Sequence, residues 1–385
     1  MTPAARLQAA AEILDRILGG AAAEQALTSW ARASRFAGSK DRAAIRDHVF
    51  DALRCKRSFA HLGGQMTGRG LILGLLRAEG QEPAAFFTGE GHAPAPLSAS
   101  EASHAPPPMP ELVALDCPDW IAPELKDSLG PDFQAVLQAL RHRAPVFLRV
   151  NTARITRDAA ALALLDAGIA TRAHPLADTA LEVTANPRAL QRSAPYLDGL
   201  VELQDASSQA VVAALPDLEG AQILDFCAGG GGKALAMAAR GADVTAHDAQ
   251  PRRMKDLPER AARARAQIAL TDSPSGQFDL VLADAPCSGT GAWRRTPGAK
   301  WTLTPGQLAR LRVTQGDILD QIAAHVRPGG WLAYATCSLL NSENIAQIGA
   351  FLARHPGFAQ TRTLGLTPIT GGDGFYIAIL KRNHP

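Results

Sequence analysis

From about residue 221 onward, short apolar segments alternate with longer amphipathic ones, and this alternation restricts the fold more than any other feature of the chain. The apolar segments have the length of strands, and the segments between them have helical periodicity. Such alternation is typical of an α/β fold, in which helices cover both faces of a parallel sheet. We predict strands over residues 222–226, 243–247, 267–271, 278–283, 331–336 and 375–380.

The preceding part of the chain has three different patterns. Apolar residues recur at helical spacing in residues 1–88, for example in the amphipathic stretch from Lys40 to Arg57, which predicts an all-α domain. Residues 89–110 are rich in Pro, Ala and Ser, so we expect a flexible linker with little order. Residues 111–203 mix helical and extended patterns and predict an α+β module. The α/β domain then covers residues 204–385.

Composition excludes several classes of protein. The longest apolar run, residues 71–76, is too short to cross a bilayer, and the charged amino terminus is unlike a signal peptide, so we expect a cytoplasmic protein. The five cysteines form no C-x-x-C pair, which favours reduced thiols and no metal site. Because the net charge is only +2, any nucleic acid must be held by local basic patches.

A glycine-rich loop, Cys227–Lys233, joins the first predicted strand of the α/β domain to a helix. Its glycines would let the backbone approach a ligand at the carboxyl edge of the sheet, where such folds bind nucleotides. Gly229, Gly231 and Ala234 also satisfy the G-x-G-x-x-A pattern of dinucleotide-binding enzymes, so an oxidoreductase is compatible with the loop. A phosphate-binding P-loop fits worse, because Cys227 replaces its first glycine. A tight turn without a ligand is a further alternative.

Acidic residues follow the next two predicted strands. Asp248 stands where a carboxylate can accept hydrogen bonds from ribose hydroxyls, as in both nicotinamide and S-adenosylmethionine enzymes. Asp272 could reach an adenine amino group, although an acid at a strand end is often a turn or helix cap.

Two cysteine motifs end the fourth and fifth predicted strands. Residues 284–291 read DAPCSGTG, and residues 334–338 read YATCS. A lone free cysteine is most often a buried core residue. Two cysteines at adjoining strand ends, each followed by serine, instead indicate that Cys287 and Cys337 form a functional pair.

Together with the loop LDFCAGGGGK, the upstream QDASSQ and the terminal GDGFYIAIL, these motifs resemble the NOL1/NOP2/Sun family of RNA cytosine-5 methyltransferases over roughly residues 118–385. SKDRAAIRDHVFDALR in the amino-terminal helices resembles a shortened NusB-like RNA-binding domain, which favours the bacterial ribosomal RNA small-subunit methyltransferase B branch. The resemblance implies a Rossmann-like S-adenosylmethionine methyltransferase domain after an α+β RNA-binding module. It also implies ribosomal RNA as the partner, and we expect a monomer.

The resemblance assigns residues to roles. It makes Cys337 the nucleophile, gives Cys287 a role in product release and places Asp284 at the target base. The cofactor would be held by Cys227, Ala228, Gly229, Gly230, Gly231, Gly232, Lys233, Asp248, Arg253, Asp272 and Asp284. The chain departs from the usual family loop, C-A-A-P-G-G-K-T, because Gly230 replaces its proline and Gly229 and Ala234 replace its second Ala and its Thr. Since a loop without proline is more flexible, cofactor affinity is the property most affected.

Methylation at carbon-5 of cytosine accounts for the paired thiols. Carbon-5 is too weakly nucleophilic to take a methyl group from a sulfonium directly, so a nucleophile such as a thiolate must first add to carbon-6. Negative charge then develops on ring nitrogen 3, which a protonated Asp284 could stabilise and Lys233 could help to orient. After methyl transfer the carbon-5 proton must leave before the thiolate is expelled, and Cys287 would assist that step.

Basic and aromatic side chains after the Cys287 motif suit RNA, because they can stack on bases and hold phosphates. We expect Arg294, Arg295 and Lys300 to bind RNA, the alternative being a solvated loop. A second basic patch would comprise Arg141, His142, Arg143, Arg149, Arg154 and Arg157. Two rival functions are a non-catalytic RNA-binding or ribosome-assembly factor and a dehydrogenase. The presence of both cysteines disfavours the first.

Overall fold

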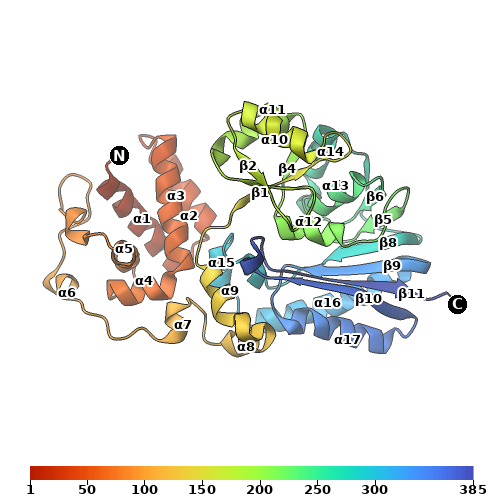
Figure 1. The fold of residues 1–385 in the computed structure, drawn as a ribbon. Helices are drawn as coiled ribbons and strands as arrows, with labels where there is room; N and C mark the ends of the chain where they lie inside the picture. Colours follow the sequence, from red (N-terminus) through yellow and green to blue (C-terminus); the bar gives the residue numbers. More distant parts are fainter. Residues whose placement is uncertain (385) are drawn as a thin grey trace. The chain divides into compact units, whose positions relative to one another are not determined.

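The computed structural model describes residues 1–384, which form two compact units. The helical unit comprises residues 1–143 and 293–302, and the sheet unit comprises residues 144–292 and the chain from Leu303 onward. Figure 1 colours both units along the sequence. The predicted combination of an all-α amino-terminal part, an α+β module and an α/β sheet domain is confirmed.

Amphipathic helices build the helical unit around one core. Ile13, Ile45 and Leu71 are fully buried there, each from a different helix. Thr2 and Thr67 begin two of the helices, since their hydroxyls accept hydrogen bonds from backbone N–H groups of the first turn. The helices of this core are α1 (Pro3–Leu18), α2 (Ala23–Ala33), α3 (Ser39–Arg54), α4 (Lys56–Gly63) and α5 (Gly68–Ala78).

Residues 89–110 pack on the helical unit, so the prediction of a segment with little order is wrong. The segment contains α6 (Ala99–Ala102), whose Glu101 accepts hydrogen bonds of 2.7 and 2.9 Å from the guanidinium of Arg69 on α5. The imidazole of His61 meets the carbonyl of Pro107 at 2.9 Å. A composition rich in Pro and Ser does not reveal such anchors, because they depend on partners far away in the sequence.

Residues 111–143 add further helices to the helical unit. They contain α7 (Glu111–Ala114), α8 (Ala122–Leu129) and α9 (Phe133–Leu140). Asp116, which is completely buried, accepts hydrogen bonds from Ser58 and from Arg141 and so ties these helices to α4. The sequence assigned this segment to the α+β module, whereas its contacts group it with the helices.

A four-stranded antiparallel sheet begins the sheet unit. Its strand order is β2-β3-β1-β4, and Leu148, Leu164 and Ile169 are completely buried in its small core. The elements are β1 (Val146–Val150), α10 (Arg157–Asp166), β2 (Thr171–Ala173), β3 (Ala180–Val183), α11 (Ala194–Leu197) and β4 (Val201–Leu203).

The main sheet has seven strands in the order β10-β11-β9-β8-β5-β6-β7. The five strands from β9 to β7 in this order are parallel, and β11 pairs antiparallel with β9 and β10. All six predicted strands are present. The bounds are β5 (Gln222–Asp225), β6 (Asp243–Ala246), β7 (Ile268–Leu270), β8 (Phe278–Asp284), β9 (Val326–Thr336), β10 (Phe358–Leu366) and β11 (Phe375–Arg382).

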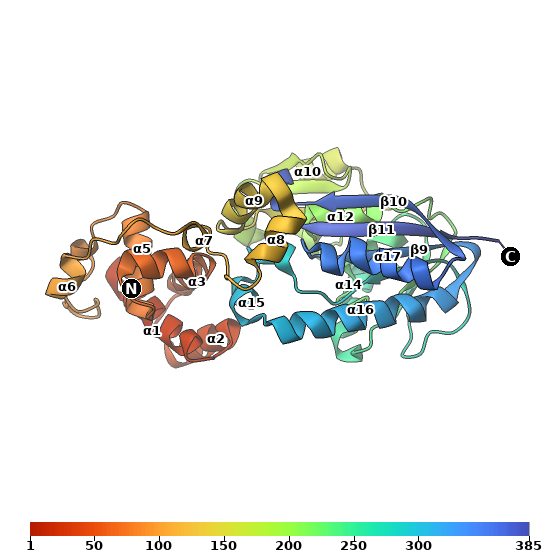
Figure 2. The same cartoon turned by 90° about the horizontal axis from the view of Figure 1, so that it is seen from below.

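Helices cover both faces of this sheet, as Figures 1 and 2 show. Alternate strand residues point to opposite faces, so Ile223 is buried in one core beside Met237, while Leu224 is buried in the other beside Leu319. The first face carries α12 (Ala206–Ala213) and α13 (Gly232–Ala238), and the second carries α16 (Pro305–His325) and α17 (Ile345–Arg354). The helix α14 (Leu257–Ala264) packs beside the strands β6 and β7.

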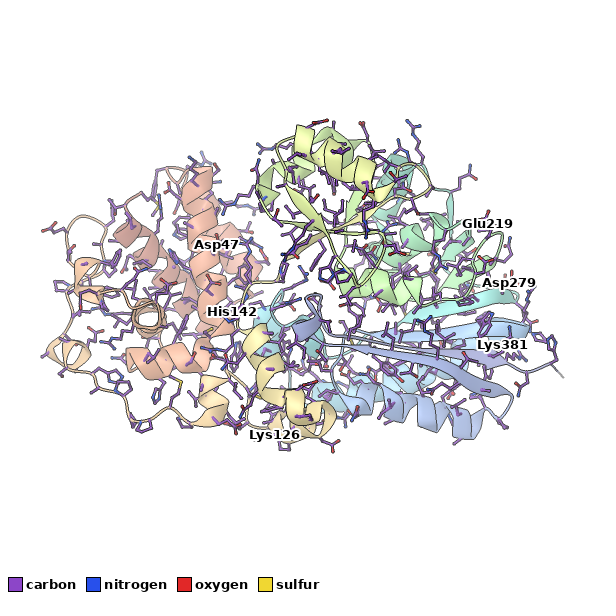
Figure 3. The ribbon with its side chains drawn as sticks, viewed as in Figure 1. Asp47, Lys126, His142, Glu219, Asp279 and Lys381 are labelled. Atoms are coloured by element: carbon purple, nitrogen blue, oxygen red, sulfur yellow. The ribbon has the colours of Figure 1, made fainter. Side chains whose placement is uncertain are left out.

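The parallel strands give the sheet two chemically different edges. Glu219, Asp279 and Lys381, labelled in Figure 3, lie at the amino-terminal edge of the parallel strands. The glycine loop and both cysteine motifs leave β5, β8 and β9 at the opposite, carboxyl edge. The chemistry predicted from sequence is therefore gathered at one edge.

Candidate active site

Cys287 and Cys337 face each other at the carboxyl edge, with their Sγ atoms 3.5 Å apart. The strands β8 and β9 bring them together, because the register places Asp284 beside Ala335 and a hydrogen bond continues from Ala285 N to Ala335 O. Both cysteines are free thiols. The contact with Cys337, together with burial, raises the pKa of the Cys287 thiol well above its usual range. Cys287 therefore keeps its proton at neutral pH.

A buried carboxylate that sequence reasoning missed lies beneath both cysteine loops. Glu343 is completely buried at the end of a short 3-10 helix, Asn341–Glu343. Its carboxylate accepts hydrogen bonds from Ser288 and Ser338, the residues that follow the two cysteines. The repeated Cys-Ser pattern was the only sequence signal, and it pointed to the thiols and not to their support.

Lys233 and Asp284 form an ion pair beside the thiols. Lys233 Nζ lies 2.7 Å from Asp284 Oδ2 and 4.8 Å from the centre of the Phe375 ring. Lys233 is buried at the start of α13 and is not a solvated surface lysine. The carboxylate of Asp284 remains partly open, with its side chain 33% exposed.

Asp225 adds a second carboxylate at the end of β5. Its side chain is buried, and the backbone N–H of Ala234 approaches its carboxylate without forming a well-aligned hydrogen bond. Burial, reinforced by the charge of Asp284, raises the pKa of Asp225 to about 7. This group was not among the predicted site residues, although its position two residues before the glycine loop could have indicated it.

The glycine loop has the backbone that its sequence requires. Gly229 and Gly231 have φ values of 51° and 78°, in the left-handed region that favours glycine. A Cβ atom at Gly231 would lie 2.1 Å from Leu257 Cδ1, so only glycine fits there. Gly230 is held by Arg260, whose guanidinium donates to the Gly230 carbonyl and also reaches Glu202 at 3.4 Å.

Asp248 connects the end of β6 to this loop. Its buried carboxylate accepts hydrogen bonds from Gly229 N at 3.0 Å and Gln250 N at 2.9 Å. Arg253 Nη1 lies 3.1 Å from the same carboxylate, which brings these two predicted cofactor residues together. Asp272 is exposed beyond β7, and no hydrogen bond links it to the loop in the described part of the chain.

The three residues predicted to contact RNA, Arg294, Arg295 and Lys300, differ in how far they are buried. Arg294 and Lys300 are only 4% and 3% exposed, which conflicts with a role in holding phosphates. Both meet Arg54 of α3: Arg54 donates to the Arg294 carbonyl, and Lys300 Nζ donates to the Arg54 carbonyl at 2.8 Å. Burial lowers the pKa of Lys300 to about 8. Arg295 is exposed and is the one residue of the three that solvent reaches freely.

The second predicted basic patch is divided between the two units. In the helical unit, Arg141 pairs with Asp116 at 2.9 Å and Arg143 pairs with Asp47 at 2.9 Å; Figure 3 labels Asp47 and His142. In the sheet unit, Arg149 is buried, which lowers its pKa to about 10. The patch is thus not a continuous set of free cations.

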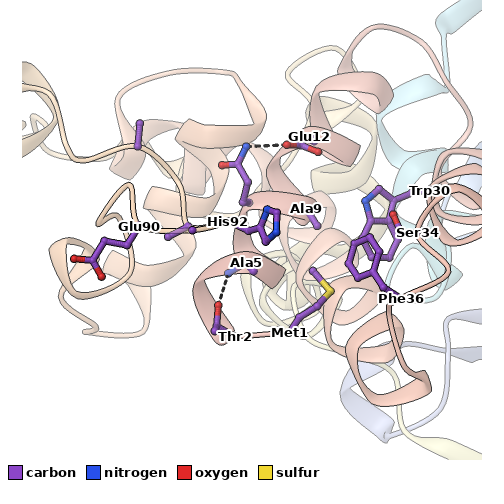
Figure 4. Close-up of a pocket in the computed structure, with 14 residues that line it drawn as sticks. Met1, Thr2, Ala5, Ala9, Glu12, Trp30, Ser34, Phe36, Glu90 and His92 are labelled. Atoms are coloured by element: carbon purple, nitrogen blue, oxygen red, sulfur yellow. Dashed lines mark hydrogen bonds between the residues drawn. The ribbon is translucent and has the colours of Figure 1, made fainter.

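A pocket in the helical unit contains none of the predicted site residues. Met1, Trp30, Phe36 and His92 are among its lining residues (Figure 4). None of the described helices has the length and apolar character needed to span a membrane. Within residues 1–384, no three His, Cys, Asp or Glu side chains gather in a way that could hold a metal ion.

Two family models match the chain. Residues 212–381 match the 16S rRNA methyltransferase RsmB/F family, and residues 117–189 match the ferredoxin-like domain of RsmF/B-like methyltransferases. The first match covers the glycine loop and both cysteine motifs. It favours methyl transfer over the dehydrogenase that the G-x-G-x-x-A pattern had left open.

Curated relatives agree with the family models. The chain is 37% identical over 284 residues to ribosomal RNA small subunit methyltransferase B of Erwinia tasmaniensis, which corresponds to 69% of this chain and 66% of that protein. It is 35% identical over 288 residues to the protein of the same name from Vibrio cholerae, covering 69% and 65% of the two chains. The chain thus spans slightly less than two thirds of the length of these relatives.

Solved structures share the fold. PH0851 superposes with a TM-score of 0.79 at 20% identity and covers 99% of both chains. NSun6 from Pyrococcus horikoshii, solved with SFG, superposes with a TM-score of 0.62 at 16% identity, covering 70% of this chain and 99% of its own.

Proposed function

Because the chain belongs to the 16S rRNA methyltransferase RsmB/F family, we propose that it transfers a methyl group from S-adenosylmethionine to carbon-5 of a cytosine in RNA, with small-subunit ribosomal RNA as the substrate. The observation that carries the proposal is the pair of thiols, 3.5 Å apart at the carboxyl edge of the sheet and next to the Lys233–Asp284 ion pair. Two adjacent thiols match a reaction in which a sulfur must first add to carbon-6 and later be released.

The residues around the glycine loop fit an adenosyl ligand. Only glycine fits at position 231, and the two positive φ values give the loop the backbone that close approach to a ligand requires. Asp248 would accept hydrogen bonds from the ribose hydroxyls through the lone pairs that Gly229 and Gln250 leave free, and Arg253, 3.1 Å from its carboxylate, would border the ligand beside it. The remaining loop residues from Cys227 to Lys233 would border the ligand. When bound, S-adenosylmethionine supplies an electrophilic methyl group.

In this proposal Cys337 is the nucleophile and Cys287 is its proton partner. The Sγ atom of Cys337 adds to carbon-6 of the cytosine. When a water molecule later takes the carbon-5 proton, the electrons of that C–H bond form the carbon-5–carbon-6 double bond. The carbon-6–sulfur bond then breaks, and its electron pair returns to Cys337 Sγ. Cys287 keeps its proton at neutral pH and lies within hydrogen-bond distance of that sulfur, so it can donate the proton to the departing thiolate.

Lys233 and Asp284 would hold the cytosine ring. The 2.7 Å ion pair favours an ionised Asp284, which can accept a hydrogen bond from the exocyclic amino group of cytosine. The ammonium group of Lys233 then provides the positive charge that stabilises the negative charge on ring nitrogen 3 during addition. This differs from the expectation that a protonated Asp284 stabilises the charge while Lys233 helps to orient the groups.

The proposal is tested with purified protein, S-adenosylmethionine and ribosomal RNA from cells that lack this gene. We expect methyl incorporation at a cytosine that bisulfite treatment no longer converts to uracil. Incorporation at another atom would contradict the proposed chemistry. RNA binding without any incorporation would favour the non-catalytic assembly factor.

A further inference from the structure

Two cysteine loops of the sheet unit share one buried support. After the hydrogen bond from Ala285 N to Ala335 O, the segments that carry Cys287 and Cys337 leave the regular sheet. One further backbone hydrogen bond, from Gly291 N to Cys337 O at 3.0 Å, joins the two loops. A shared side-chain contact adds to this backbone bond.

Glu343 makes that contact on both sides. Its Oε1 atom accepts from Ser288 N at 2.9 Å, and its Oε2 atom accepts from the hydroxyls of both Ser288 and Ser338. Each serine directly follows one of the cysteines. One carboxylate thus joins the two loops through the neighbours of the two thiols.

Gln315 extends the support to the other side of Cys287. Its Nε2 atom donates to Glu343 Oε1 at 2.9 Å and to the carbonyl of Pro286 at 2.9 Å. The residues before and after Cys287 are therefore both held by the Gln315–Glu343 pair. This pair comes from α16 and the 3-10 helix before α17, which belong to the helix layer under the sheet.

The network suits a charged carboxylate. Glu343 is completely buried. Four donors from the neutral residues Ser288, Ser338 and Gln315 satisfy its oxygens. A buried charge held only by hydrogen bonds is costly, so it needs all of these donors in place. Displacing either loop would leave the carboxylate partly unsatisfied.

We propose that Glu343 is a positioning residue that sets the spacing of Cys287 and Cys337 by hydrogen bonding to Ser288 and Ser338. The inference rests on the proposed cysteine chemistry and adds a division of labour to it. Ser338 positions the sulfur that attacks, and Ser288 positions the thiol that releases the product. Glu343 links the two steps.

The experiment uses the full chain with target RNA and follows the covalent protein–RNA species in a single turnover. Because a displacement of about 1 Å can cost about 100-fold in rate, we expect Ser338→Ala to slow formation of the adduct by about 10- to 100-fold. Ser288→Ala should form the adduct nearly normally but slow its decay by a similar factor. Glu343→Gln should slow both steps. S-adenosylmethionine affinity, measured by calorimetry, should stay within about twofold, since none of the three residues borders the glycine loop.

The control variant is Asn151→Ala. Asn151 is also buried and donates from its side chain to two carbonyls, those of Gly199 and Ala264, but it contacts neither cysteine loop. It should lower thermal stability and change the rates of adduct formation and adduct decay by the same factor. If the serine variants behave like this control, with both steps slowed equally, Glu343 has only a structural role.

A second measurement needs no RNA and separates this inference from the proposed function. Diamide, a diazene that is reduced to its hydrazine, takes two hydrogens from a thiol pair and leaves a disulfide. We expect Glu343→Gln and Ser338→Ala to slow formation of the Cys287–Cys337 disulfide by about tenfold, as followed by peptide mass spectrometry. Unchanged rates would overturn the inference even if the wild type methylates RNA. Slower rates in a protein that forms no adduct would uphold the positioning role and refute the proposed reaction.

Discussion

Arg260 donates a hydrogen bond to the carbonyl of Gly230, the residue that replaces the proline of the loop that this chain resembles. A Cβ atom at position 230 would lie 3.0 Å from Arg260 Nη1, so a bare glycine leaves the space that the guanidinium occupies. Glu202 holds Arg260 from the other side at 3.4 Å. A proline ring would restrict the loop backbone at this position. The Arg260 side chain supplies part of that restriction instead.

The first prediction is that Arg260→Ala weakens S-adenosylmethionine binding roughly tenfold, because the loop loses a charge-assisted hydrogen bond. Gly230→Ala should have a similar effect by displacing the guanidinium. The two changes together should cost no more than either alone, since they break the same contact. Arg263→Ala is the matched control, because Arg263 pairs with Glu202 at 2.7 Å without a hydrogen bond to Gly230. If calorimetry finds that the losses of binding free energy in the two single variants add fully in the double variant, Arg260 does not act through the Gly230 contact.

The second prediction concerns Asp248, which both orders the loop and faces the expected ribose. Asp248→Ala should weaken S-adenosylmethionine binding by about 1–3 kcal/mol. Asp248→Asn should lose less, because its remaining oxygen can still accept a hydrogen bond from Gly229 N. An affinity unchanged in both variants would remove Asp248 from the cofactor site. Nicotinamide binding by the wild type would restore the dehydrogenase alternative.

The third prediction is a pH dependence that comes from Asp225. Its pKa is about 7 in the folded protein and near the ordinary value of 3.8 when unfolded, so the folded state holds the proton more tightly. The resulting stability is complete below about pH 4 and is lost as the pH rises to about 7. Asp225→Asn should remove this loss and unfold at higher urea concentration than the wild type at pH 8. Urea titrations in which both proteins show the same pH profile would contradict the assignment.

The fourth prediction separates the basic residues after Cys287. Arg295→Ala should weaken RNA binding and reduce its salt dependence, because fewer counterions are released from the complex. Lys300→Met should instead act on the helical unit, since it removes the donor to the Arg54 carbonyl. We expect a lower melting temperature and an unchanged salt slope. A larger loss of salt dependence in Lys300→Met than in Arg295→Ala would show that the buried lysine becomes exposed to RNA.

The sequence predicted the sheet well because hydrophobic periodicity reports burial, and the strands β5, β8 and β9 are buried along most of their length. The strand β10 was missed because it is an edge strand whose central residues are exposed and polar. Such a strand has no apolar pattern in its sequence, and it forms because it pairs with β11.

The motifs predicted that the two thiols lie together, and sequence reasoning missed groups whose position depends on tertiary contacts. The sequence indicated Cys287 and Cys337, and the structure places them together. Glu343 lies six residues beyond Cys337, and its link to Ser288 depends on strand order and not on spacing. Arg294 and Lys300 were misassigned because a basic side chain near a site looks the same in sequence whether it faces phosphate or a buried carbonyl.

We assign the attack on the base to Cys337 and the release of the product to Cys287. Each cysteine is changed to alanine, and the protein is incubated with target RNA and S-adenosylmethionine and then separated on a denaturing gel. Cys287→Ala should accumulate a slow-migrating covalent protein–RNA band, because the adduct forms but cannot be resolved. Cys337→Ala should show no such band, because it lacks the attacking sulfur. A band with Cys337→Ala and none with Cys287→Ala would contradict the assignment.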